Sequence, residues 1–194
     1  MINCMSTQTK EQLLENLYKP YKDNDALLVQ GGSNRIIFGE GDPNAKLMFI
    51  GEAPGATEDK LMRPFVGRSG RLLNTILNQS GSDRSHVFIT NIVKVRPPNN
   101  RTPFPEEIAK GRALLLKQID IIRPTVICTL GASALEGLLG KGIAISGLRG
   151  TRIPFNGTTV IPTFHPAYIL RDMNKLPILL QDIALAITVS QNIS

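Results

Sequence analysis

The chain has 194 residues, of which 42% are apolar and 20% are charged. This composition is typical of one globular domain, so we treat residues 1–194 as a single domain with residues 1–36 as a lead-in helix and loop. Its 22 basic and 16 acidic side chains give a net charge of +6, which favours polyanionic partners without identifying one. Two cysteines, Cys4 and Cys128, are too few for a disulfide framework, a cysteine-rich zinc site or a four-thiolate iron–sulfur cluster.

Two further features argue against secretion and against a membrane span. Residues 1–10 are polar and do not resemble a signal peptide. The longest apolar stretch, residues 176–189, is too short to cross a bilayer and contains Gln181 and Asp182. We therefore expect a cytoplasmic protein with no membrane partner, in which this stretch is a helix packed on the core. We also expect a monomer, although no residue pattern in the sequence indicates the oligomeric state.

The predicted elements alternate along the chain. A helix-prone segment at residues 9–17 comes first, and Ser69 is a candidate N-cap for a later helix. Short apolar runs predict buried strands at residues 47–50, 87–90, 125–130 and 159–163. Helical patterns lie between and after them, at residues 69–79, 105–122, 132–139 and 175–189. This alternation predicts an α/β domain with a largely parallel sheet of about four strands.

Polar or glycine residues follow each predicted strand at the point where it ends. Glu52 comes after the first strand, Asn91 after the second, Gly131 after the third and His165 after the fourth. Ligands of such sheets bind outside the carboxyl ends of the strands. We therefore expect these residues to lie along one edge of the sheet.

Glu52 and His165 are the candidates for acid–base and electrostatic chemistry. A carboxylate in the glycine-flanked turn at Glu52 could orient or deprotonate a water, although a capping glutamate would look the same. A neutral imidazole at His165 could donate a hydrogen bond to an oxygen that gains negative charge. The alternative is a structural histidine. His86, the other histidine, is expected on the surface.

Phe65 and Asn91 are the candidates for contact with a base. An aromatic ring on a loop can stack on a base, and a side-chain amide offers both a donor and an acceptor to the edge of a pyrimidine. The alternatives are a core phenylalanine and an asparagine that ties down a loop. Residues 67–70 open a helix and could bind a phosphate through backbone N–H groups, or could be an ordinary N-cap.

Basic residues are frequent in the loops that follow the strands. They could contact the phosphates of a nucleic acid, or they could form a solvated face. The residues concerned are Lys94, Arg96, Arg101, Arg149, Arg152 and Arg171.

Six segments in this order and spacing resemble the family-4 uracil-DNA glycosylases, from about Ile37 to the end of the last helix. The resemblance implies a three-layer α/β/α fold with a central four-stranded, mainly parallel sheet. The six segments are residues 51–55 (Gly-Glu-Ala-Pro-Gly), 58–59, 64–67, 90–94, 96–101 and 163–171.

The resemblance also implies roles for individual residues. Glu52 and His165 match the catalytic motifs, and better-known relatives have a water-activating aspartate where this chain has Ala53. Ile169 or Leu170 matches the wedge that enters the minor groove. The implied uracil-binding residues are Gly51, Ala53, Glu58, Phe65 and Asn91, and the implied DNA-binding residues are Ser69, Arg96, Arg101, Pro166, Ile169, Leu170 and Arg171.

One departure from the family concerns its cofactor. Family-4 enzymes typically hold a [4Fe–4S] cluster with four cysteines, two of them upstream of the first motif. Val95 occupies the place of the third cysteine, and residues near Gly111 occupy the place of the fourth. We therefore expect no cluster, no other cofactor and no metal.

The resemblance implies an enzyme that flips uracil out of DNA and hydrolyses its N-glycosidic bond, which leaves an abasic site. Its partner would be uracil-containing DNA. One alternative is a relative that binds uracil in DNA without turnover; the covalent form of that behaviour is disfavoured because residues 92–103 contain no histidine. The other alternative is a small nucleotide-binding α/β protein.

Overall fold

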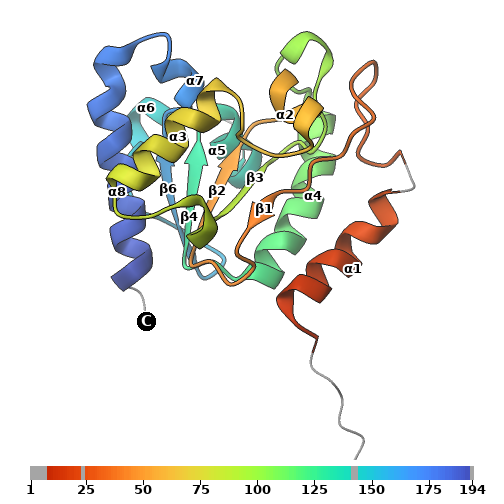
Figure 1. Cartoon of the computed structure of the whole chain (residues 1–194), viewed down its shortest axis with the longest axis horizontal. Helices are drawn as coiled ribbons and strands as arrows, with labels where there is room; N and C mark the ends of the chain where they lie inside the picture. The colour runs from red at the N-terminus through yellow and green to blue at the C-terminus, as the bar shows by residue number, and fades with distance from the viewer. Residues whose placement is uncertain (1–7, 23–24, 141–143, 193–194) are drawn as a thin grey trace, which may run out of the picture.

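A single mixed sheet runs through the centre of the molecule (Figure 1). The computed structural model describes residues 8–22, 25–140 and 144–192, and within these residues the sheet has six strands. Their order is β1-β3-β2-β4-β6-β5. The bounds are β1 Glu40–Gly41, β2 Leu47–Gly51, β3 Phe88–Asn91, β4 Val126–Leu130, β5 Ile153–Phe155 and β6 Thr158–Thr163.

The four inner strands confirm the predicted sheet. Strands β3, β2, β4 and β6 are parallel neighbours, so their carboxyl ends lie at one edge. The two outer strands were not predicted: β1 pairs antiparallel with β3, and β5 pairs antiparallel with β6. They have only two and three residues and include Gly41 and Pro154, so they carry no strand pattern.

The longer helices agree with the sequence pattern. Helices α4 and α5 have the predicted limits, whereas α3 begins one residue early because Gly67, not Ser69, is its N-cap. The short helices α2, α6 and α7 were not predicted. The bounds are α1 Lys10–Lys22, α2 Ala56–Leu61, α3 Arg68–Gln79, α4 Pro105–Ile122, α5 Ala132–Leu139, α6 Ile145–Leu148, α7 Pro166–Ile169 and α8 Leu176–Asn192, with 3-10 turns at Arg84–His86, Pro98–Asn100 and Met173–Lys175.

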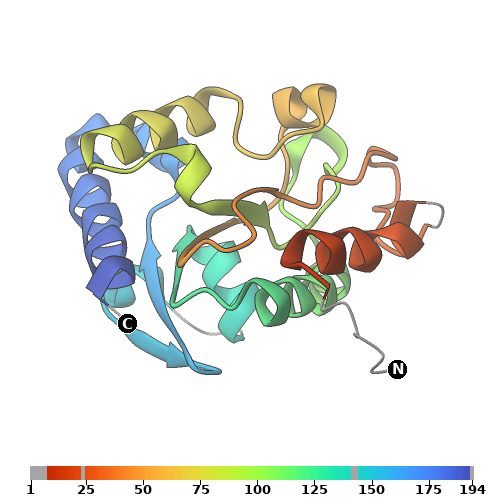
Figure 2. The same cartoon turned by 60° about the horizontal axis from the view of Figure 1, so that its bottom comes forward.

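Successive side chains along the buried strands point to opposite faces of the sheet and form two hydrophobic cores, one on each face. Phe49 and Cys128 point to the face that α3, α7 and α8 cover. Met48 and Ile127 point to the opposite face, which α1, α4 and α5 cover. Figure 2 shows α3 and α8 on one side of the sheet and α4 on the other. The fold is therefore the expected three-layer α/β/α arrangement.

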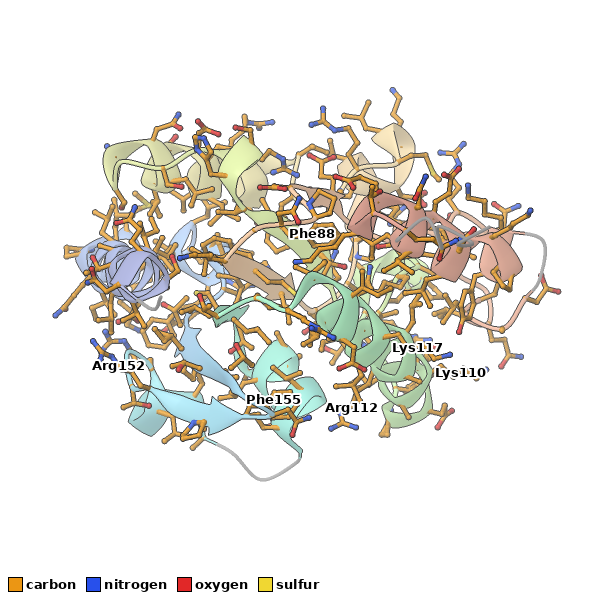
Figure 3. All side chains as sticks on the ribbon, turned by 90° about the horizontal axis from the view of Figure 1, so that it is seen from below. Phe88, Lys110, Arg112, Lys117, Arg152 and Phe155 are labelled. Atoms are coloured by element: carbon orange, nitrogen blue, oxygen red, sulfur yellow. The ribbon has the colours of Figure 1, made fainter. Side chains whose placement is uncertain are left out.

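The outer surface of α4 carries charges of both signs, because Glu106 and Asp120 are exposed on it as well as two lysines. Lys110 and Lys117 are exposed and point away from the core, as the view from below shows (Figure 3). Helix α8 packs against β4 and β6, as predicted for the long apolar stretch. Among the described residues, no helix combines the length and the apolar character that a membrane span requires.

Candidate active site

A small cavity opens at the carboxyl edge of the sheet, where the predicted site residues were expected to meet. Its walls come from the turn after β2, from α2, from the loop before α3, from the end of β3 and from the start of α7. The lining residues are Ala53, Glu58, Phe65, Ser69, Asn91 and His165. Five of these six were predicted to bind uracil or to act in catalysis, and Ser69 was predicted to contact DNA.

Asn91 is the last residue of β3, and its side chain is only 1% exposed. Among the described residues, none donates a hydrogen bond to its Oδ1 atom. Gly51 lies beside it at the same register of β2, and a Cβ atom there would be 2.5 Å from Asn91 Oδ1 and 2.5 Å from Phe65 Cζ. The absence of a side chain at Gly51 thus lets the Phe65 ring and the Asn91 amide both lie against the end of β2. Buried acceptors are almost always satisfied, so Asn91 Oδ1 is available to a donor from a water or a ligand.

Phe65 forms an aromatic wall of the cavity, and its ring centroid lies 5.8 Å from that of His165. Its backbone is in the left-handed region, with φ +51°, which a non-glycine residue adopts only when its surroundings hold it there. Gly70 supplies part of that restraint because a Cβ atom there would lie 1.9 Å from the Phe65 carbonyl oxygen. The structure thus places Phe65 on the cavity wall, and its stacking on a base stays a prediction.

Two charged side chains hold the loop that carries Phe65. Glu58 Oε1 accepts hydrogen bonds from the backbone N–H groups of Val66 (2.9 Å) and Gly67 (2.7 Å). Arg84 Nη1 donates to the Phe65 carbonyl at 3.0 Å. Glu58 was predicted as a pocket residue, whereas Arg84 was missed, because it lies in a 3-10 turn far along the chain and no motif marks it. Both side chains position the aromatic wall.

His165 is a neutral hydrogen-bond donor in this arrangement. It caps α7, and its Nδ1 atom accepts from the backbone N–H of Ala167 at 3.0 Å, so the proton sits on Nε2. Burial, reinforced by the positive charge of Arg171, lowers the pKa of His165 to about 4. Gly131, with φ +96°, passes so close that a Cβ atom there would be 3.1 Å from His165 Cβ.

Glu52 lies beside the cavity and does not line it. It follows Gly51 directly, is partly exposed, and its main-chain oxygen accepts from the Val93 N–H at 2.9 Å. Ala53 takes the place on the cavity wall. The water-orienting role of Glu52 therefore stays a prediction.

Comparison with known proteins gives this geometry a family. The model of the uracil DNA glycosylase superfamily matches residues 38–184. The chain belongs to the uracil DNA glycosylase superfamily. It is similar to the type-4 uracil-DNA glycosylase of Thermotoga maritima, with 47% identity over 90% of this chain and 93% of that protein. The type-4 enzymes of Sulfurisphaera tokodaii (44% identity, 74% of this chain and 70% of that protein) and Pyrobaculum aerophilum (40%, 81% and 85%) are also similar.

The basic residues predicted to contact DNA differ in availability in this superfamily member. Arg171 is exposed next to the cavity, and Arg96 donates to Asn100 Oδ1 at 2.8 Å. Arg101 is instead held by both oxygens of Glu107, at 2.9 and 2.7 Å. The hydrogen bonds from Arg101 keep the pKa of Glu107 below its ordinary value. A phosphate would have to compete with this bidentate pair.

Two other basic residues are engaged inside the protein. Lys94 is only 1% exposed, because its side chain turns back into the core, so the prediction that it could contact phosphates is wrong. Arg149 is partly exposed and forms an ion pair with the buried carboxylate of Asp182, with which a phosphate would have to compete. Its contact with phosphates stays a prediction. His86, by contrast, is exposed as predicted.

Of the two residues predicted as the DNA wedge, only one is accessible at the surface. Ile169 is fully buried in the core between α3, α7 and α8, so its prediction as a wedge is wrong: withdrawing it would open a cavity in that core. Pro166 is also buried, at the first position of α7, and does not present a surface to DNA. Leu170 is partly exposed and remains the candidate.

The positions that would hold an iron–sulfur cluster do not fit one. Val95 is fully buried in an apolar cluster with Leu14, Val29 and Leu115. At Gly111 any side chain would collide with the main chain, since a Cβ atom would be 2.2 Å from the Ile92 carbonyl oxygen.

The cysteines lie elsewhere. Cys128 is buried on the opposite face of the sheet, where burial raises the pKa of its thiol, and Cys4 lies outside the described residues. Among the residues that the structure describes, no group of three or more His, Cys, Asp or Glu side chains could hold a metal ion.

Proposed function

We propose that this protein removes uracil from DNA by hydrolysing the N-glycosidic bond, as the first step of base excision repair. The unsatisfied acceptor of Asn91, in a cavity that Phe65 and His165 also line, carries the proposal. The type-4 uracil-DNA glycosylases that resemble the chain over most of its length support it.

Recognition of uracil follows from the donors and acceptors that the cavity offers. Asn91 Oδ1 would accept from N3–H of the base, and the amide nitrogen would donate to O4. Phe65 would stack on the ring. Cytosine has no hydrogen on N3 and carries an amino group at position 4, so both contacts with Asn91 would be lost or repulsive. Sites that bury polar groups reject such analogues strongly.

Bond cleavage requires stabilisation of the leaving base. The C1′–N1 bond would break through an oxocarbenium-like sugar, and its electron pair would leave with the uracil anion. Nε2–H of His165 would donate to O2 of that anion. Glu52 would orient a water that adds to C1′, and the proton that this water loses would pass through the Glu52 carboxylate and solvent to the departed uracil anion. These steps need no metal and no cofactor, so we propose that none takes part.

Access to the base requires it to leave the DNA stack. Leu170, at the end of α7, would fill the vacated space, and Arg171 and Arg96 would contact the phosphates. We propose that the protein acts as a monomer.

An oligonucleotide with a single uracil tests the proposal against its alternatives. We expect release of free uracil and an alkali-labile abasic site, and no release from the same oligonucleotide with cytosine. A stable protein–DNA adduct, or tight binding without release, would identify a non-turnover relative. Absence of both release and binding would favour a small nucleotide-binding protein.

A further inference from the structure

Lys94 is a buried cation three residues beyond Asn91, and the proposed function gives it no role. Its side chain turns back toward the end of β3, so that Nζ lies 2.7 Å from Thr90 Oγ1 and 2.7 Å from the Asn91 carbonyl oxygen. The third contact of Nζ, at 2.6 Å, is Gln118 Oε1 in the middle of α4. All four residues are 1% exposed or less.

The directions of these hydrogen bonds can be assigned from their neighbours. The Thr90 hydroxyl donates to the Phe38 carbonyl at 2.7 Å, so its oxygen accepts from Lys94. Gln118 Nε2 donates to Tyr18 Oη at 2.6 Å and to the Phe38 carbonyl at 2.8 Å, so its Oε1 atom faces Lys94. Nζ therefore needs three hydrogens for three acceptors, which is the ammonium form.

This arrangement is costly in an apolar core. None of the three acceptors carries a charge, and burial lowers the pKa of Lys94 well below its ordinary value. A methionine of similar shape would avoid the loss of hydration. The buried ammonium is therefore not explained by a gain in stability. Its contact with the Asn91 carbonyl oxygen indicates instead that it positions the main chain at Asn91.

The backbone around Asn91 is held from two sides. On the sheet side, the N–H groups of Ile92 and Val93 donate to the carbonyls of Gly51 and Glu52, both at 2.9 Å. On the other side, Lys94 holds the carbonyl of Asn91 itself. Together these contacts fix the strand end from which the side-chain amide projects into the cavity.

We propose that Lys94 is a positioning residue for uracil recognition: its ammonium fixes the Asn91 carbonyl and so aims the Asn91 amide at the base. Through Gln118 and Tyr18, the same network ties this amide to α1, in the layer of helices on the far face of the sheet. This inference rests on the proposed uracil excision and gives Lys94, which never touches the base, a supporting role in its recognition by Asn91.

The test is a double-mutant cycle measured by single-turnover uracil release. Lys94→Met keeps the length of the side chain and removes all three donors, and we expect excision to slow by about 10- to 100-fold. In an Asn91→Ala background the same change should add less than about twofold, because the residue acts through Asn91. Affinity for an abasic oligonucleotide should stay within about twofold of the unmodified protein.

Three results would overturn the proposal. The first is excision by Lys94→Met at the original rate, and the second is multiplicative slowing in the Asn91→Ala background. The third is an equal rate of excision by Tyr18→Phe and by its matched control Tyr21→Phe, which lies on the same helix.

Tyr18→Phe removes only the hydroxyl that accepts from Gln118, and it replaces Lys94→Met as the test if that variant does not fold. We expect Tyr18→Phe to slow excision by about fivefold, and to cause no further slowing in the Asn91→Ala background.

Failure of the proposed function can be distinguished from failure of this inference. If the proposed function is wrong, the unmodified protein itself releases no uracil from the oligonucleotide, so there is no excision rate that the variants could change.

Discussion

Asn91 and Gly51 lie side by side on parallel strands, and this pair sets the chemistry of the cavity at the scale of single residues. The strand end places the amide, and the missing side chain at Gly51 lets the Phe65 ring lie beside it. A side chain at Gly51 would collide with both the ring and the amide. Without the amide, the cavity would not distinguish one base from another.

Replacement of Asn91 by aspartate tests this account of selectivity. In Asn91→Asp the carboxylate has no hydrogen to donate and repels O4 of uracil. We expect uracil excision to fall by about 100-fold, which corresponds to about 3 kcal/mol of lost transition-state stabilisation. The aspartate is also expected to tolerate the amino group of cytosine better. Competition between uracil and cytosine oligonucleotides measures both effects, and an unchanged preference would contradict the role of Asn91.

The low pKa of His165 predicts how stability depends on pH. This pKa falls from 6.5 to about 4 on folding, so the unfolded chain takes up the proton first as the solution is acidified. The free energy of unfolding should therefore decrease between pH 6.5 and about 4, by about 3 kcal/mol at most, and this contribution is fully present above pH 6.5.

His165→Asn separates this titration from the cap of α7, because Oδ1 of asparagine can still accept from Ala167 N–H. We expect stability near that of the unmodified protein at pH 7 and a flatter decline in acid, together with excision slower by orders of magnitude. Denaturant unfolding between pH 4 and 8 measures the first effect. Parallel pH profiles for the two proteins would show that His165 is not the group concerned.

At the scale of elements, the segment between α2 and α3 is a rigid support and not a mobile loop. Glu58 on α2 binds the two amides that follow Phe65, and Arg84 binds the carbonyl of Phe65 from the 3-10 turn before β3. Salt bridges from Glu40 to Arg84 (2.5 Å) and Arg63 (2.8 Å) extend this support to β1. The strained φ of Phe65 is thereby maintained without a ligand.

Glu58→Ala should release the aromatic wall. Loss of the two hydrogen bonds that Val66 and Gly67 donate to this carboxylate is expected to lower the free energy of unfolding by about 2 kcal/mol and the Tm by about 4–8 °C. Excision should fall because the ring is no longer held parallel to an incoming base. Lys60→Ala, an exposed position on the same helix, is the control. Calorimetry measures the Tm of both variants, and a uracil-release assay measures their excision. An unchanged Tm for Glu58→Ala would show that Glu58 does not hold the loop that carries Phe65.

At the scale of the whole molecule, the basic residues behind the net charge of +6 differ in whether they are free to contact DNA. Arg171 is exposed beside the cavity. Arg101 instead forms an ion pair with Glu107, and its Cζ atom lies 3.8 Å from the centroid of the Phe104 ring. The electrostatic attraction to DNA should therefore depend on the first of these arginines and not on the second.

The salt dependence of DNA binding tests this difference. Arg171→Ala should reduce the slope of log K against log salt concentration by about 1, the value for one phosphate contact. Arg101→Ala should leave the slope unchanged and lower the stability instead. Titrations of an abasic oligonucleotide at several salt concentrations provide the slopes. Equal slopes for the two variants would show that exposure does not decide which arginine binds DNA.

The architecture and the meeting point of the site could be predicted because both follow from local patterns. Buried apolar runs mark the inner strands, and in a parallel sheet the residues after them must share an edge. The supports could not be predicted in the same way. Arg84 and Lys94 look like ordinary surface cations in the sequence, and only the packing of distant elements shows that Lys94 is buried and that Arg84 holds a carbonyl. Ile169 failed as a wedge for the same reason, since burial of a hydrophobic residue in a short helix depends on its neighbours.

The link between Tyr18 and Gln118 has a practical consequence for defining the boundaries of this enzyme. The family model begins at residue 38, so a fragment chosen by homology would omit α1. Such a truncation would strip the stacked partner from Phe38, whose ring lies 4.2 Å from that of Tyr18, and would leave Gln118 one acceptor short. We expect a fragment that begins at residue 38 to distinguish uracil from other bases less well than the 194-residue chain does.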